Sequence, residues 1–324
     1  MTATTSVRSV AALASLAILE TAGFPDYRLL DSGNGRKLER FGRVVVDRPE
    51  PQALWLPSLD QARWTAAHAV FTGDEEETGR WRRDNAVPES WPIAVENVNL
   101  LAKLGGFLHL GLFPEQVPHW QWMSRTIQSL SAELGAERPR VLNLFAYTGA
   151  ASLIAARAGA DVVHVDASKK SVTWARENQT ASRLGDAPIR WIVEDARKFV
   201  AREVRRGRTY HIVLVDPPKF GRGPGGEVWE LLEHLPPLLK DCTALLAPRA
   251  SLVLTAYAIR ASSLSFGQLL GELLQGREGA FDIGELAIRE HEGTRRIATS
   301  LFARWSSLPG AFASPHAGTP RYGA

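Results

Sequence analysis

Cysteine and long apolar runs are nearly missing from this sequence, and each absence excludes a class of protein. Cys242 is the one cysteine among 324 residues, which excludes a disulfide framework and a multi-cysteine metal site and indicates a reducing compartment. No apolar run approaches the ~20 residues that a membrane-spanning helix needs. The hydrophobic share (45%) and the charged share (23%) are those of an ordinary globular protein. We therefore expect a cytoplasmic protein without a metal and without membrane contact.

The charge of the chain is small and uneven. The net charge is +3, yet residues 1–110 hold 12 Lys and Arg against 14 Asp and Glu, whereas residues 111–324 hold 26 against 21. A basic face on the second part would suit an anionic partner such as RNA. Solvated surface arginines explain the same counts, so the charge alone does not decide between them.

The first residues are apolar and poor in acids. Residues 10–19 resemble the hydrophobic region of a signal peptide, but Glu20 interrupts the pattern and no Ala-x-Ala cleavage site follows. We predict instead a packed or frayed helix within residues 2–22.

Residues 24–110 indicate a small β-rich domain. Short strands are expected at 27–30 and 43–46 around the turn at 31–35. Residues 106–116 predict a last strand that leads into the next helix. Six of the ten tryptophans lie at or before Trp122. We expect these rings to fill a core, and a face that stacks bases is the alternative.

From residue 140 onward, strands and helices alternate strictly, which predicts a parallel sheet with right-handed crossovers. The expected strands are residues 140–145, 161–166, 189–194, 210–216 and 250–257, and the expected helices are 168–182, 196–206, 227–246 and 262–275. Residues 281–290 and 295–305, joined by a short turn, predict an antiparallel hairpin. The sequence thus predicts a β-rich domain over residues 1–110, an α/β domain over 111–307 and a disordered tail over 308–324.

The turn after the first of these strands differs from the common nucleotide loops. Residues 143–149 contain one glycine and no lysine. A dinucleotide loop needs several glycines and a triphosphate loop needs glycines and a lysine, so both are excluded. A loop with one glycine can still pack against a compact, uncharged ligand.

Acidic residues end the following strands. Asp166 lies where a carboxylate at the end of a second strand accepts hydrogen bonds from two ribose hydroxyls. Asp195 is placed to accept an adenine amine, although a helix N-cap is the alternative role for it. Asp216, followed by Pro217 and Pro218, ends a fourth strand. Three acids at consecutive strand ends favour a nucleoside site over three separate caps.

These motifs together resemble the class I S-adenosylmethionine-dependent methyltransferases, and most closely the bacterial large-subunit rRNA methyltransferase I family. The similar residues lie within about residues 105–305 and include Asn178 and the segment that begins at Phe113. The resemblance implies a Rossmann-like, mostly parallel sheet with an antiparallel C-terminal hairpin, S-adenosylmethionine as the cofactor and rRNA as the partner.

The resemblance also implies roles for individual residues. The implied cofactor-binding residues are Phe113, Pro114, Gln116, Asn143, Phe145, Tyr147, Thr148, Gly149, Asp166, Ala167, Ser168, Asp195, Ala196 and Asp216. The implied catalytic residues are Asp216, Pro217, Pro218, Lys219 and Phe220. Asp216 and the prolines would orient a planar nitrogen, and Phe220 would stack on the base. The glycine-rich residues 221–226 would form a mobile lid.

The chain departs from that family in two respects. It shows no pattern of the RNA-binding PUA domain in residues 1–100, and the stretch after the strand at 250–257 carries no cysteine. Carbon-5 of a pyrimidine needs a thiolate to activate it, and Cys242 lies in a predicted helix, where a packed thiol is expected. We therefore expect transfer to nitrogen or oxygen.

Two basic segments are candidates for RNA contact. Arg197, Lys198, Arg202, Arg205, Arg206 and Arg208 form one, and Arg80, Arg82 and Arg83 around Trp81 form the other. For the first segment a solvated helix face is the more common explanation. RNA methylation is the leading hypothesis. A small-molecule or protein acceptor is the second, and a non-catalytic cofactor-binding or RNA-binding module is the third.

Overall fold

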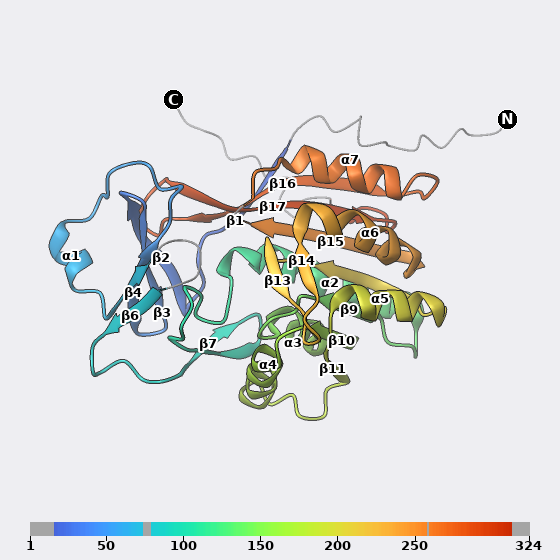
Figure 1. Cartoon of the computed structure of the whole chain (residues 1–324), viewed down its shortest axis with the longest axis horizontal. Helices are drawn as coiled ribbons and strands as arrows, with labels where there is room; N and C mark the ends of the chain where they lie inside the picture. Colours follow the sequence, from blue (N-terminus) through green and yellow to red (C-terminus); the bar gives the residue numbers. More distant parts are fainter. Residues whose placement is uncertain (1–15, 74–78, 258, 313–324) are drawn as a thin grey trace.

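The computed structural model describes residues 16–73, 79–257 and 259–312, and a sheet of eight strands forms its larger part (Figure 1). The strand order is β1-β16-β17-β15-β12-β9-β10-β11. The bounds are β1 (Ala17–Thr21), β9 (Arg140–Leu144), β10 (Asp161–Asp166), β11 (Ile189–Val193), β12 (Tyr210–Val215), β15 (Leu246–Tyr257), β16 (Ala280–Arg289) and β17 (Arg296–Ser306). Strands β15, β12, β9, β10 and β11 are parallel, and β16 and β17 form an antiparallel hairpin. The predicted fold class is confirmed.

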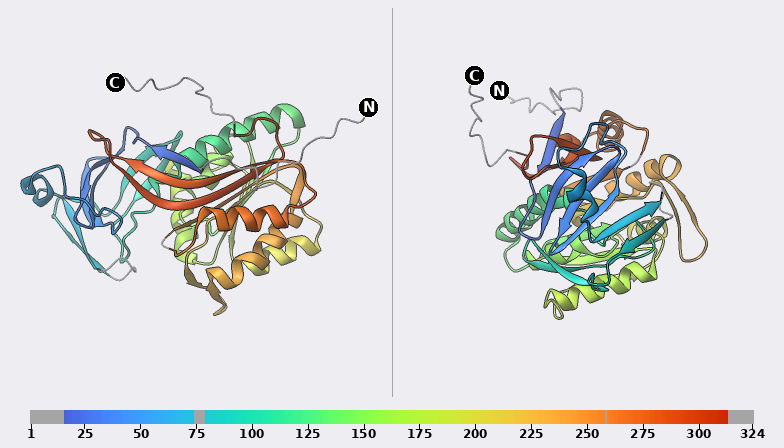
Figure 2. Two further views of the ribbon diagram at one scale, coloured as in Figure 1. Left: turned by 90° about the horizontal axis from the view of Figure 1, so that it is seen from above. Right: turned by 90° about the vertical axis from the view of Figure 1, so that its left-hand side faces the viewer.

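Helices cover both faces of this sheet, so that the larger part has three layers (Figure 2). One face carries α2 (Val117–Leu134), α3 (Ala150–Arg157) and α4 (Lys169–Ala181), and the other carries α5 (Ala196–Arg205), α6 (Leu231–Ala244) and α7 (Ser263–Leu273). Successive residues of a strand point to opposite faces. Accordingly, Val141 packs with the α2 and α3 side, whereas Leu142 and Leu144 pack with the α5 and α6 side. None of the helices among the described residues has the length and apolar character to cross a membrane.

The prediction of a helix within residues 2–22 was wrong for residues 16–22, the part of this segment that the structure describes. Residues 17–21 form β1, which pairs in parallel with β16 at the edge of the large sheet. The main-chain hydrogen bonds offered by β16 outweigh the local preference of an Ala- and Leu-rich segment for helix. Residues 1–15 lie outside the described part of the chain.

A smaller β-rich part precedes the parallel strands. One sheet contains β2 (Tyr27–Gly33), β3 (Arg36–Phe41), β4 (Val44–Pro49), β5 (Ala69–Gly73) and β6 (Gly79–Arg83), and a hairpin contains β7 (Trp91–Val95) and β8 (Val98–Ala102). A short helix, α1 (Gln61–Thr65), lies between β4 and β5. The prediction missed β3, which occupies the gap between its two expected strands. The strand expected within residues 106–116 is absent. Strand β8 is the last strand before α2.

Four of the six tryptophans at or before Trp122 are core residues, as the sequence predicted, and Trp55 and Trp81 are partly buried against the core. Trp64, Trp91, Trp120 and Trp122 are buried. Residues 308–312, the start of the expected disordered tail, pack on α2: the indole N–H of Trp122 donates to the Ala311 carbonyl (2.8 Å) and its ring stacks on Phe312. Residues 313–324 lie outside the described part of the chain.

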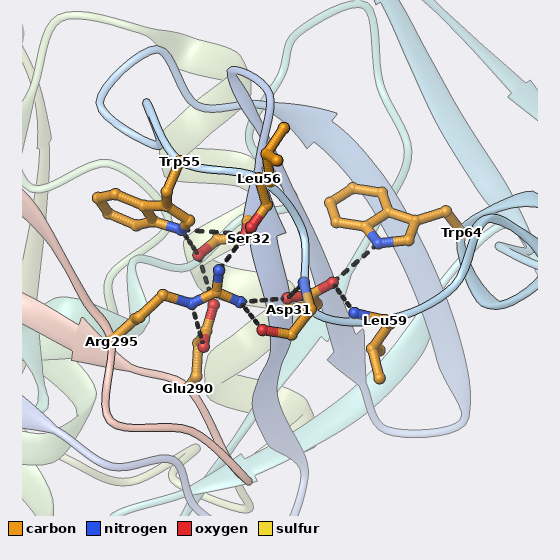
Figure 3. A network of polar contacts seen from close by, with 9 residues as sticks. Asp31, Ser32, Trp55, Leu56, Leu59, Trp64, Glu290 and Arg295 are labelled. Atoms are coloured by element: carbon orange, nitrogen blue, oxygen red, sulfur yellow. Dashed lines mark hydrogen bonds and ion pairs between the residues drawn. The ribbon is translucent and has the colours of Figure 1, made fainter.

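A buried polar network joins the small sheet to the turn between β16 and β17 (Figure 3). The guanidinium of Arg295 lies between the carboxylates of Asp31 (2.7 Å) and Glu290 (2.8 Å). Its Nη1 also donates to the Leu56 carbonyl (2.7 Å), and Ser32 donates to Glu290 (2.6 Å). Burial opposes ionisation of Asp31, but N–H donors from Leu59, Ser58 and Trp64 lower its pKa. The two parts of the chain are therefore held together by a charged, hydrogen-bonded contact.

Replacing Arg295 by alanine is expected to destabilise the protein by roughly 3 kcal/mol, because two buried carboxylates lose their counter-charge. Urea unfolding measures this loss. Arg296→Ala is the matched control: Arg296 is the next residue and pairs with Glu20 at the surface, where an ion pair contributes at most about 1 kcal/mol. Equal stability losses in the two variants would contradict the assignment.

Candidate active site

The turn that follows β9 has an unusual backbone. Phe145 (φ 55°), Tyr147 (φ 49°) and Gly149 (φ 84°) all adopt the left-handed region. Such a conformation costs a non-glycine residue about 1–3 kcal/mol, and strained residues of this kind cluster at functional sites. Glycine suits position 149 for two reasons. It adopts a positive φ without strain, and a Cβ there would lie only 3.0 Å from the Cβ of Ala175.

Buried hydrogen bonds hold this turn in place. The carboxamide of Asn178 donates to the Thr148 carbonyl (2.9 Å) and accepts from the Leu101 N–H (2.8 Å), which joins the turn to β8. Asn143 donates to Ser152 (2.9 Å), which in turn contacts His164 (3.0 Å). Asn143 therefore helps to fix the turn against α3, and its side chain also lines the cavity described below.

Asp166 lies at the end of β10, beside this turn. Its Oδ2 accepts from the Tyr147 N–H and its Oδ1 from the Ser168 N–H, each at 2.8 Å. Burial raises the pKa of this carboxyl, and the two N–H donors oppose the rise. Each carboxylate oxygen has two lone pairs, so both retain capacity to accept a hydroxyl from a ligand. The structure places Asp166 at the end of the second parallel strand, as the sequence predicted, and its role in binding ribose stays a prediction.

Asp195 follows β11 and is the N-cap of α5. Its Oδ1 accepts from the Lys198 N–H (3.1 Å), and the guanidinium of Arg197 lies 3.4 Å away. The cap that the sequence offered as an alternative is therefore present. Asp195 and Ala196 nevertheless line the same cavity as Asp166, so the cap does not exclude a contact with the cofactor.

Asp216 directly follows β12 and is half-buried. The Gln116 carboxamide, in the 3-10 helix η2 (Pro114–Gln116), donates to its Oδ2 (3.1 Å). Burial, together with the negative charge of the nearby Glu115, raises the pKa of Asp216 to about 7. Gln116, which was predicted to bind the cofactor, lines the same cavity and also contacts the proposed catalytic carboxylate; its role in cofactor binding stays a prediction. Near neutral pH, Asp216 can therefore take up or release a proton.

The glycine-rich segment after Pro218 is the tip of a β-hairpin. Strands β13 (Phe220–Arg222) and β14 (Val228–Glu230) flank it, so the helix expected at 227–246 begins later, at Leu231. The pairing of β13 with β14 overrides the helical periodicity of residues 227–230. Trp229 fastens the hairpin: it packs on Phe145 and donates its indole N–H to the Pro218 carbonyl (2.7 Å). The segment that the sequence predicted as a mobile lid is therefore part of a β-hairpin.

A cavity of about 490 Å³ lies at the carboxyl ends of these strands. Among the predicted site residues, those that line it are Phe113, Gln116, Asn143, Phe145, Tyr147, Thr148, Asp166, Ala167, Ser168, Asp195, Ala196, Asp216, Pro218 and Phe220. Pro114, Gly149, Pro217 and Lys219 do not line it, and Lys219 lies instead over the Phe220 ring. The cavity is also lined by residues that were not predicted as site residues from the sequence: Phe107, His109, His119, Trp229, Thr255, Tyr257 and Ser300.

The charge of the cavity fits a cationic ligand. Glu115, Asp166, Asp195 and Asp216 line it, and Arg222 is the one Lys or Arg among the described lining residues. Such a lining repels a polyphosphate and attracts a cation. S-adenosylmethionine carries a sulfonium cation, a ribose and an adenine, for which the acidic lining, Asp166 and the aromatic walls are suited. The described residues contain no cluster of His, Cys, Asp and Glu that would hold a metal ion.

Comparison with known proteins decides the family. The family model described as S-adenosylmethionine-dependent methyltransferase matches residues 64–266. The chain belongs to this family. The methyltransferase is 51% identical to the structure of an S-adenosylmethionine-dependent methyltransferase from Agrobacterium tumefaciens, with a TM-score of 0.85 over 90% of this chain and 94% of that one. The predicted cofactor, S-adenosylmethionine, and the predicted class of enzyme are thus confirmed.

Among curated proteins, the methyltransferase is 29% identical over 180 residues to the ribosomal RNA large subunit methyltransferase K/L of Hahella chejuensis. It is 37% identical over 81 residues to the ribosomal RNA large subunit methyltransferase I of Shewanella frigidimarina. These alignments cover 55% and 25% of this chain, but only 22% and 20% of the relatives. The methyltransferase therefore spans about a fifth of the length of these relatives.

The basic run in and after α5 is largely neutralised in the methyltransferase. Arg197 pairs with Asp195, Lys198 with Glu227, Arg202 with Glu194 and Arg206 with Glu203. Arginines held by neighbouring carboxylates attract phosphates less than free ones do, so this helix is a weak candidate for RNA contact.

Proposed function

We propose that the methyltransferase methylates ribosomal RNA, at a nitrogen or oxygen atom and without a cysteine nucleophile. The observation that carries the choice of atom is the half-buried carboxylate of Asp216, which lines the cavity while Cys242 does not. Cys242 is buried in α6, and burial raises the pKa of its thiol far above neutrality. A protonated thiol in the core cannot attack a pyrimidine ring. The rRNA methyltransferases among the relatives support RNA as the acceptor.

The residues of the site have distinct tasks in this proposal. S-adenosylmethionine, when bound, supplies a methyl group on a positively charged sulfur. Asp166 binds the ribose, and the turn at residues 143–149 seats the methionine part. The Asp216 carboxylate accepts a hydrogen bond from the acceptor N–H, which turns the nitrogen lone pair toward the methyl carbon.

In the proposed step, the acceptor nitrogen gains a methyl group and transfers a proton to Asp216. A bond forms between the acceptor nitrogen and the methyl carbon while the carbon–sulfur bond breaks, and its electron pair remains on sulfur. The acceptor nitrogen then carries an extra proton, which passes to the Asp216 carboxylate. A residue whose pKa is near 7 can accept that proton and return it to solvent.

The proposed function is tested by mass mapping of the modified nucleosides in rRNA from a strain that lacks this gene. We expect one methylated nucleoside to disappear, and the purified protein to restore it on rRNA from that strain. A strong decline of RNA affinity with salt would further favour RNA over a small-molecule or protein acceptor. Identical nucleosides in both strains, together with no methyl transfer to this rRNA in vitro, would overturn the proposal.

A further inference from the structure

Exposed Phe, Tyr and Trp rings are confined to one place among the described residues. Among the described Phe, Tyr and Trp side chains, Phe107 and Phe220 are the two that are mostly exposed, each 61%, and both line the cavity of the active site. A scattered exposed apolar residue needs no explanation. Two such rings on one cavity, with none elsewhere in the described chain, indicate a surface that meets a flat apolar partner. Phe220 belongs to the motif already described, whereas Phe107 does not.

The position of Phe107 is set by the small β-rich part. The indole N–H of Trp81 donates to the Phe107 carbonyl (3.0 Å), and the Trp81 ring packs on Phe71 at 5.2 Å. Trp81 lies on β6, so the small sheet holds the main chain of Phe107 while the ring remains exposed. The segment between β8 and η2 thus brings Phe107, which belongs to none of the motifs, into the active site.

His109, two residues further on, lines the same cavity. Its ring lies 4.6 Å from that of Phe113 and 6.0 Å from that of Tyr257. Burial, with the positive charges of Arg48 and Lys37, lowers its pKa to about 3, so the imidazole is neutral. Its buried Nδ1 has no hydrogen-bond partner among the described residues. A buried polar atom is normally paired with protein, water or ligand.

Strand order places His109 on the acceptor side of the cavity. Along the carboxyl edge of the sheet the order runs from β11 and β10, which carry Asp195 and Asp166, through β9 to β12 with Asp216 and then β15 with Tyr257. Tyr257 therefore lies beyond Asp216, away from the ribose and adenine end. His109, which contacts Tyr257, belongs to the same side.

We propose that Phe107 and His109 form the wall that recognises the acceptor: the Phe107 ring stacks on a nucleobase, and His109 Nδ1 hydrogen-bonds to the edge of that base. This inference rests on the proposed function and specifies the acceptor as an unpaired base, since a base inside a duplex has neither face free. It also gives the small β-rich part a role, because Trp81 positions the ring that contacts the substrate.

The test compares variants in methyl transfer to rRNA from the strain that lacks the gene. Base stacking on an aromatic ring is sequence-tolerant and strong, so Phe107→Ala and Phe107→Leu are each expected to lower kcat/KM about 5- to 100-fold through a higher KM. Phe107→Trp should retain activity. His109→Phe keeps the ring packing but removes the hydrogen bond, and a loss of roughly 2- to 10-fold is expected. Affinity for S-adenosylmethionine, measured by calorimetry, should not change in any of them.

Leu264→Ala is the matched control, since Leu264 is an exposed apolar side chain on α7 that does not line the cavity. It should match the parent protein in kcat/KM. Full activity in Phe107→Leu, or equal losses in Phe107→Trp and Phe107→Ala, would overturn the stacking role. Because Phe107 is largely exposed, none of these substitutions should prevent folding.

A second measurement separates failure of this inference from failure of the proposed function. Saturation-transfer NMR detects binding of the four ribonucleoside 5′-monophosphates to the protein loaded with S-adenosylhomocysteine, and it does not require rRNA to be the acceptor. Binding to the parent protein that is lost in Phe107→Ala supports the wall even if rRNA is not methylated. Binding that is absent in the parent protein, or equal in both proteins, overturns it.

Discussion

Asparagine in place of Asp216 is expected to lower kcat about 100-fold or more while affinity for S-adenosylmethionine changes by less than about threefold. Asparagine has the size of aspartate and its carbonyl can still accept from Gln116, which holds Oδ2 at 3.1 Å. What it loses is the capacity to take a proton, and a positioned acid or base contributes about 10²- to 10⁴-fold to a rate. A loss confined to kcat would therefore identify Asp216 as the residue that handles the acceptor proton.

Single-turnover methyl transfer measures this effect directly, and calorimetry reports the cofactor affinity. Asp186→Asn is the control, because Asp186 is exposed and does not line the cavity. It should behave as the parent protein. Full turnover in Asp216→Asn would remove Asp216 from the catalytic step.

The same residue predicts the pH dependence. Burial and Glu115 raise the pKa of Asp216 to about 7, so the carboxyl is protonated below pH 7 and ionised above it. The proposed step needs the ionised form, and kcat/KM should therefore rise with pH through about 7. The positive charge of bound S-adenosylmethionine stabilises the carboxylate further. The inflection in kcat should therefore lie at lower pH than the inflection in kcat/KM for S-adenosylmethionine. Asp216→Asn should lack both inflections.

Alanine in place of Asp166 is expected to weaken binding of S-adenosylmethionine about 100-fold or more. Two charge-assisted hydrogen bonds to ribose hydroxyls would be lost, each contributing about 1.5–3 kcal/mol. The same change removes the acceptor of the Tyr147 N–H (2.8 Å), which supports the left-handed turn. Both effects act on the ground state, so Kd should rise.

Calorimetric titration with S-adenosylmethionine and with S-adenosylhomocysteine tests this prediction, and both ligands should weaken in parallel because they share the ribose. Asp161→Ala is the control, since Asp161 is at the opposite, exposed end of β10 and pairs only loosely with Arg138 at 3.8 Å. An unchanged Kd in Asp166→Ala would show that the ribose is held elsewhere.

The sequence carried most of the information about the parallel part of the fold, because that information is local. The strands that end near Asp166, Asp195 and Asp216 are short apolar runs that stop at polar residues, and a parallel sheet brings their carboxyl ends to one edge. The position of these acids around one cavity could therefore be predicted from spacing alone. Their roles in binding and catalysis stay predictions, to be decided by the variants above.

What the sequence could not reveal depends on contacts between distant segments. Residues 17–21 look helical by composition, and residues 227–230 continue the periodicity of α6, yet each pairs as a strand with a partner that composition does not indicate. Phe107 and His109 precede every recognised motif and reach the cavity because Trp81 and Phe113 hold their segment. No periodic pattern or strand-end rule could have placed them there.

The parallel pair of β1 and β16 has a consequence for the order of assembly. Ala17 pairs with Gly284. Strand β1 is synthesised early and β16 late, so β1 cannot pair until most of the chain has been made. Strands β9 to β12, which carry the cofactor side, can associate earlier. Until β1 arrives, β16 has an open edge, which is a surface prone to pairing with other chains. Ala17–Thr21 therefore closes the sheet late, and a chain that fails to dock it would be expected to aggregate rather than lose the cofactor site.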